Sequence, residues 1–182
     1  MNLLFRTALL YLRARRHPKL GVHDVARTPF RVVPSDLDVL GHMNNGVYFS
    51  IMDLGRMDLM IRAGVWKKLM QRGFYPVVTK ETISFRKSLQ PWQRFTVESR
   101  IAGYDDKAVF IEQRFVVNGE IFARAFMCGR FLKKTGGTVS MTELADALGV
   151  DTSEVTLPAW LTRWAEDMVL PATRAQAPSE WS

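Results

Sequence analysis

NNGVYFSIMDLGRMDLMIRAG, residues 44–64, has the residue spacing of a helix whose surface is apolar on most sides. Two apolar lines run along it, one formed by Val47, Ile51 and Leu54 and the other by Tyr48, Met52 and Leu59. Asn44 or Asn45 caps its start, and Asp58 and Arg62 are spaced for an exposed ion pair. Because so much of its surface is apolar, the helix is expected to be enclosed by other elements.

The segments around this helix have the pattern of strands. One strand is expected at 28–34 and four more follow the helix, at 75–85, 94–103, 108–117 and 120–134. In the run at 94–103, apolar or small residues alternate with polar ones, which gives one core face and one wet face. Asn118-Gly119 is a strong hairpin signal. The sequence therefore predicts an α+β domain in which an antiparallel sheet curves around one central helix.

The carboxyl-terminal part of the chain has helical signals. Ser140 and Glu143 have the spacing of a capping box at the start of a short helix that ends near Gly149. A second helix is expected from Pro158 onward. The residues from Pro171 are typical of a frayed tail.

The first 16 residues predict an amphipathic helix. Its apolar residues at helical spacing are Leu4, Ala8 and Leu12, with Phe5 and Leu9 beside them. Arg6 interrupts the apolar run and the other arginines follow it, so neither a secretory signal nor a membrane span is expected. The favoured interpretation is that this helix packs on its own domain. The alternative is peripheral contact with a membrane surface through the apolar residues and the basic end.

Composition sets the class of protein and its possible partners. A chain of 182 residues is expected to form one domain with terminal additions, and Cys128 as the single cysteine excludes an internal disulfide and a zinc site built on a cysteine pair. The expected location is the cytoplasm, with membrane association as an option. The net charge of +7 favours an anionic partner. Nucleic acid is not expected, because the basic residues are dispersed and no recognition motif is visible.

The polar stretch SDLDVLGHMNN, residues 35–45, precedes the central helix directly. The residues that carry a resemblance are Asp36, Leu37, Asp38, Gly41, His42, Asn44, Asn45 and Tyr48. In this order, before a buried helix and an antiparallel sheet, they resemble the hotdog-fold thioesterases, in particular the 4-hydroxybenzoyl-CoA and acyl-ACP thioesterases. The resemblance covers 28–134 and implies a hotdog domain there. It does not extend to the two ends, where the residue patterns predict an amphipathic helix and linker at 1–27 and a helical extension and tail at 135–182.

Thioester hydrolysis requires a carboxylate that attacks the carbonyl or activates water, and donors where the oxyanion develops. The resemblance assigns the carboxylate to Asp38 and the oxyanion donor to the backbone amide of Asn45. His42 would orient water, share a proton or bind the thioester oxygen. Leu40 and Ser88 stand where the acyl-ACP branch has an asparagine and a glutamate, so any activity must proceed with fewer polar groups than in that branch.

The same polar residues also have a purely structural interpretation. Asp36 can close a turn, Asn44 or Asn45 can cap the helix, and His42 can satisfy a backbone carbonyl. A metal site from Asp36, Asp38 and His42 is not expected, because no further ligands cluster near them in the sequence.

The expected substrate is an acyl-CoA or an acyl-carrier-protein thioester, which brings its own phosphates, and no separate cofactor is expected. Candidate phosphate-binding residues are Lys80, Arg86, Lys87, Arg130 and Lys133, with Lys134 beside them. The alternatives are a module that binds acyl thioesters or lipid without hydrolysis, and a hotdog enoyl hydratase. The resemblance further implies a homodimer or homotetramer, in which joined sheets share active sites.

Overall fold

The structure, a computed structural model, describes residues 3–172 and 174–179. Its strands are β1 Ala26–Arg31, β2 Phe74–Phe85, β3 Arg94–Tyr104, β4 Val109–Val117 and β5 Glu120–Lys133. Its helices are α1 Leu3–Ala14, α2 Asn45–Arg62, α3 Val65–Arg72, α4 Met141–Leu148 and α5 Ala159–Asp167, with short 3-10 turns at Pro34–Asp36 and Thr152–Glu154.

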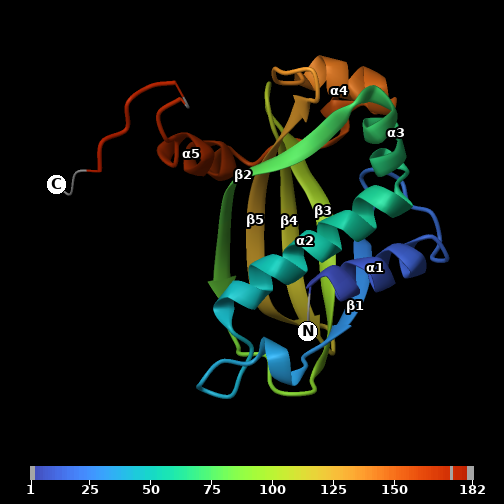
Figure 1. The fold of residues 1–182 in the computed structure, drawn as a ribbon, viewed down its shortest axis with the longest axis vertical. Coiled ribbons are helices and arrows are strands. Elements are labelled where there is room, and N and C mark those ends of the chain that lie inside the picture. The colour runs from blue at the N-terminus through green and yellow to red at the C-terminus, as the bar shows by residue number, and fades with distance from the viewer. Residues whose placement is uncertain (1–2, 173, 180–182) are drawn as a thin grey trace.

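The strands form one antiparallel sheet in the order β1-β3-β4-β5-β2, and α2 crosses one face of it (Figure 1). The expected strands and central helix are confirmed.

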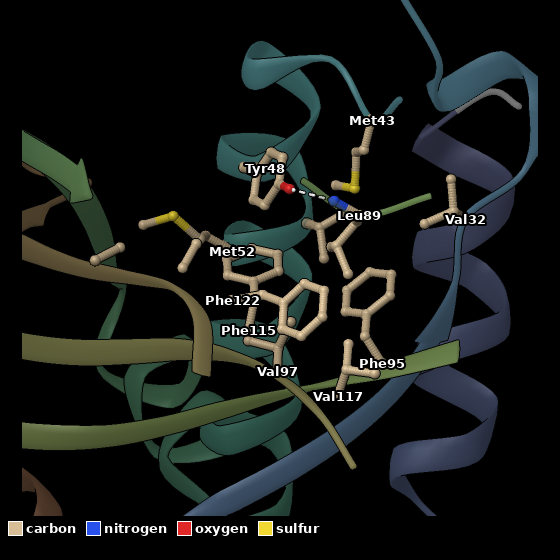
Figure 2. Packing of buried hydrophobic residues seen from close by; sticks show 13 residues of the cluster. Val32, Met43, Tyr48, Met52, Leu89, Phe95, Val97, Phe115, Val117 and Phe122 are labelled. Atoms are coloured by element: carbon tan, nitrogen blue, oxygen red, sulfur yellow. Dashed lines mark hydrogen bonds between the residues drawn. The ribbon is translucent and has the colours of Figure 1, made fainter. Parts of the chain in front are cut away.

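The main core lies between α2 and the sheet (Figure 2). Tyr48, Ile51 and Met52 of α2 are at most 1% exposed, because they pack against the inward side chains of β3, β4 and β5. Gly55 lets α2 approach the sheet closely, since a Cβ there would lie 2.9 Å from Val97 Cγ1 and 3.0 Å from Gln113 Nε2. The helix is therefore held against the sheet along its middle.

The ion pair within α2 differs from expectation. Arg62 Nη1 lies 3.2 Å from Asp58 Oδ2, as the spacing predicts, but the side chains of Arg62 and Asp58 are only 9% and 3% exposed. Thr28 of β1 donates a hydrogen bond to the same carboxylate oxygen, and Arg62 Nε donates to the carbonyl of Pro18. The prediction of an exposed pair is wrong because β1 and the segment before it cover this side of the helix.

The hairpin turn and the N-cap at Ser140 are confirmed. Asn118 and Gly119 both have positive φ angles, 50° and 82°, as a tight two-residue hairpin turn requires. Ser140 Oγ accepts a hydrogen bond from the amide of Glu143 at the start of α4. Helix α3 was not predicted. Gly64, at φ 71°, ends α2, and the chain then resumes helical geometry at Val65.

Helix α1 packs on the domain, but through a different face from the one expected. Its buried residues are Arg6, Leu10 and Ala14, whereas Phe5, Leu9 and Leu12 are 62%, 37% and 59% exposed. The side chain of Leu4 lies outside the described part of the chain. The expectation that Phe5 and Leu12 cover the domain is wrong, because the inward stripe contains Leu10, which lies on the opposite side of the helix. Within residues 3–172 and 174–179, no helix combines the length and apolarity needed to cross a membrane.

Candidate active site

Residues 36–44 form a small hairpin that leads into α2. Asp38 N–H donates to the carbonyl of His42 at 3.0 Å, and Asn44 N–H donates to the carbonyl of Asp36 at 2.8 Å. Gly41, at φ 80°, has the left-handed geometry that allows the chain to turn back. As a result Asp38 and His42 form a cross-strand pair at the base of a loop.

The side chains of this pair face each other. His42 Nδ1 lies 3.5 Å from Asp38 Oδ2, close enough for an ion pair, but the two atoms do not meet hydrogen-bond geometry. Asp38 Oδ1 accepts a hydrogen bond from Leu40 N–H at 2.9 Å. His42 Nδ1 is buried and has no hydrogen-bond partner among the described residues. A buried polar atom without a partner is uncommon, and here it faces a carboxylate that retains one uncommitted oxygen.

The other aspartate of the motif has a structural environment. Asp36 Oδ2 accepts hydrogen bonds from Arg6 Nη2 of α1 at 2.6 Å and from Val33 N–H at 3.0 Å. Its side chain is only 4% exposed. Asp36 therefore closes a turn and anchors α1, while Asp38 remains partly accessible. In the part of the chain that the structure describes, no three His, Cys, Asp or Glu side chains are grouped as a metal site requires.

The first turn of α2 presents a backbone donor beside the hairpin. The side chain of Asn44 caps the helix by accepting from Gly46 N–H at 2.8 Å, and Val47 N–H bonds to the carbonyl of Asn44. For Asn45 N–H the described residues supply no acceptor. A free amide at the positive end of a helix of 18 residues suits a developing oxyanion.

The segment after β2 fixes the position of the hairpin. Met43 N–H donates to the carbonyl of Leu89 at 2.9 Å, and Leu89 N–H donates to the hydroxyl oxygen of Tyr48 at 3.2 Å (Figure 2). Burial raises the pKa of Tyr48, so its hydroxyl stays neutral and available for this contact. The loop tip, by contrast, is open, because Val39 and Leu40 are 101% and 75% exposed. The carboxylate of Asp38 therefore lies between the hydrogen-bonded base of the hairpin and an exposed apolar loop tip.

The candidate phosphate-binding residues lie at two ends of the β2–β5 pair. Arg86 and Lys87 follow the end of β2, near the start of α2, and both contact Glu120. Arg130 is exposed on β5 opposite the start of β2, and Lys133 nearby pairs with Glu143. Lys80 lies between the two ends in β2. Within one chain these side chains do not form a single patch.

A buried charged network in the middle of α2 was not predicted. Arg56 is 4% exposed and donates to Glu81 of the edge strand β2 at 2.6 Å, to Gln113 of β4 at 2.9 Å, and to Asp53. Burial raises the pKa of Glu81, and the charge and hydrogen bond of Arg56 oppose that rise. Asp53 and Arg56, three residues apart on a helix whose surface is mostly apolar, were the sequence signal for this network.

An apolar cavity of about 470 Å³ lies at the other end of α2 from Asp38. It is enclosed by the carboxyl-terminal half of α2, α3, the start of β2, the sheet and α4. Its α2 lining begins at Asp53, eight residues after Asn45, which corresponds to about 12 Å along the helix. This apolar cavity and the candidate catalytic loop of one chain are thus separated by the packed core around Tyr48.

Comparison with known proteins identifies the class. A family model described as the thioesterase-like superfamily matches residues 32–165, and the chain belongs to this superfamily. The chain is also 36% identical over 129 residues to protein THEM6 of Xenopus laevis. That match covers 69% of this chain and 61% of the frog protein, so the chain spans about three-fifths of the length of this relative.

Two solved structures support the fold. A probable thioesterase from Escherichia coli, YbaW, superimposes with a TM-score of 0.64 at 21% identity, covering 68% of this chain and 96% of that one. A gentisyl-coenzyme A thioesterase superimposes with a TM-score of 0.59 at 17% identity, covering 66% and 98%. The expected hotdog fold and the expected thioesterase family are confirmed. The roles of individual residues stay predictions.

Proposed function

We propose that this protein hydrolyses an acyl thioester, with acyl-CoA as the preferred substrate class, and releases a free acid and a thiol. The observation that carries this proposal is the juxtaposition at the start of α2. There the carboxylate of Asp38, facing His42 Nδ1 at 3.5 Å, stands in a hairpin that leads directly to the free amide of Asn45. Membership in the thioesterase-like superfamily supports the same reaction.

In the proposed reaction the thioester oxygen accepts a hydrogen bond from Asn45 N–H, at the positive end of α2. Asp38 either takes a proton from water, which then attacks the carbonyl carbon, or attacks that carbon itself to form an anhydride that water opens. In both routes the C–S bond breaks and the thiolate leaves with a proton. His42, whose Nδ1 has no hydrogen-bond partner among the described residues, would hold the water or pass on that proton.

We further propose that two copies complete each site. Strands β1 and β2 are the sheet edges, and α1 lies beside β1, which leaves the 12-residue strand β2 as the open edge (Figure 1). Two copies related by a twofold axis would pair their β2 strands antiparallel, so the end of β2 in one copy would meet its start in the other. Arg86 and Lys87 would then approach the Arg130 and Lys133 of the second copy.

The same arrangement accounts for the separation between cavity and loop. A ring contact between Tyr48 and Phe85, with centroids 5.0 Å apart, holds the start of α2 beside the end of β2. In the pair, the Asp38 loop of one copy would therefore lie next to the cavity mouth formed by Tyr75 and Val78 of the other. An apolar acyl group would enter the cavity, while the phosphates of coenzyme A would meet the basic residues at the rim.

The test is a thiol-release assay with the full chain over a panel of acyl-CoAs that differ in chain length and in aromatic character. Hydrolysis of at least one member, with a free acid as the second product, is expected. A protein that only binds acyl thioesters would release no thiol from any member. A hydratase would consume an enoyl-CoA without thiol release, and either result would overturn the proposal.

A further inference from the structure

We propose that the outward face of helix α1 docks on the surface of an anionic phospholipid bilayer. This proposal is independent of the hydrolytic function.

Helix α1 has two distinct faces. One face, with Arg6, Leu10 and Ala14, is buried against the domain. At about 100° per residue, Phe5 and Leu12 lie about 140° and 160° around the helix from Leu10. Both point away from the protein, 62% and 59% exposed.

The inward face of α1 already has its partners within the domain. Its one charge, on Arg6, is paired with Asp36 at 2.6 Å, and both side chains are buried. The helix is therefore fixed to the domain without help from Phe5 or Leu12. A helix that is held by one face and still carries large apolar side chains on the other leaves apolar surface for a separate partner.

Charge indicates what that partner is. Residues 1–23 contain no aspartate or glutamate, and four basic residues lie in 13–19, namely Arg13, Arg15, Arg16 and Lys19. Arg15 lies over the ring of Tyr11, 5.0 Å from its centroid, and none of the four forms an ion pair among the described residues. Apolar side chains followed by unpaired cations match an interface where acyl chains lie beneath negative headgroups.

A second copy of the chain is a poorer occupant of this surface. Helix α1 lies along α2 on the β1 side of the sheet, whereas the open edge is β2, on the opposite side (Figure 1). Pairing through β2 therefore leaves the outward face of α1 uncovered. Two such faces in contact would also bring eight unpaired cations together without any acidic residue from the same segment.

The test is co-sedimentation of the full chain with phosphatidylcholine vesicles, with and without phosphatidylglycerol. The wild-type protein is expected to bind only the vesicles that contain phosphatidylglycerol, and to bind them less as salt is added. Phe5→Ser combined with Leu12→Ser should abolish binding with an unchanged melting temperature. Arg15→Gln combined with Arg16→Gln should weaken binding about 30-fold.

Lys67→Gln combined with Arg72→Gln is the matched control, because it removes two exposed charges from α3 and should leave binding unchanged. The proposal is overturned if the wild-type protein binds neither vesicle, or if the arginine variant binds as well as the wild type does. It is equally overturned if the serine variant breaks an oligomer in light scattering while vesicles remain unbound, since the face would then belong to a second copy. If the serine variant has a lower melting temperature than the wild type, vesicle binding by the arginine variant tests the proposal instead.

Discussion

Arg6 and Asp36 form a buried ion pair, with 2.6 Å between Nη2 and Oδ2, that joins α1 to the turn two residues before Asp38. Asp36→Asn would leave the guanidinium of Arg6 buried without a counter-charge. We expect the free energy of unfolding to fall by roughly 3 kcal/mol, as when one member of a buried pair is removed. A urea titration measures this loss. An unchanged unfolding midpoint would show that the pair does not hold α1.

His42 is expected to assist the reaction rather than carry it. His42→Ala should lower kcat by about 100-fold, the lower end of the range for a group that moves a proton. The side chain is 29% exposed and its Nδ1 has no partner among the described residues, so stability should change little. Steady-state kinetics beside a melting curve test both statements. If His42→Ala lowered kcat more than Asp38→Asn does, His42 would be the principal group and Asp38 the assisting one.

The open edge of β2 predicts an oligomer that a single charge can disrupt. Val78 lies in β2 and is 46% exposed. Val78→Lys would bring cations together across paired edges, so light scattering should report a monomer where the parent is at least a dimer. Val169→Lys, at another exposed valine, is the control and should remain assembled. A parent that is monomeric and active would contradict the shared site.

Glu112 on the outer face of the sheet predicts a dependence of stability on acid. Burial would raise the pKa of its carboxyl, but hydrogen bonds from Arg100 and Arg114 and the charge of Arg124 hold that pKa below the ordinary 4.5. A lowered folded pKa means that the stabilisation is present above pH 4.5 and is lost as the pH falls through the lower value. Glu112→Gln should cost about 2 kcal/mol at neutral pH.

In acid the Glu112→Gln variant should be as stable as the parent, because the parental carboxyl is then protonated and carries no charge, like the amide of the variant. Chemical denaturation of both proteins over a pH series measures the difference directly. A cost that stays constant down to strongly acidic pH would mean that the arginines do not act through the carboxylate charge.

The fold was predictable where local chemistry determines the geometry. Asn118-Gly119 requires positive φ angles and Ser140 carries its own acceptor, so both were predicted without knowledge of distant residues. The burial of Asp58 and Arg62 was not predictable in this way, because it depends on Thr28, which lies 30 residues before Asp58. Helix α3 was not predictable in the same way, because the helical pattern of residues 44–64 stops at Gly64, whereas the chain resumes helical geometry directly at Val65.

The candidate site was predictable in residue types but not in arrangement. The resemblance identified Asp38, His42 and Asn45. Their separation depends on the register of the 36–44 hairpin, which brings Asp38 opposite His42. That Asp36 faces Arg6 could not be read from the sequence, because the two are 30 positions apart.

Thiol release by Asp38→Asn, measured beside Asp36→Asn, tests the central claim most directly, because the same chemical change is made at two aspartates two residues apart. With the acyl-CoA that the parent hydrolyses best, Asp38→Asn should lower turnover by about 10,000-fold, at the upper end for a group that moves a proton. Its unfolding free energy should remain within about 1 kcal/mol of the parent, since the side chain is partly exposed. Asp36→Asn should lower the free energy of unfolding, but the fraction of this variant that is folded should turn over substrate at the parental rate. Parental turnover in a folded Asp38→Asn protein would contradict the account.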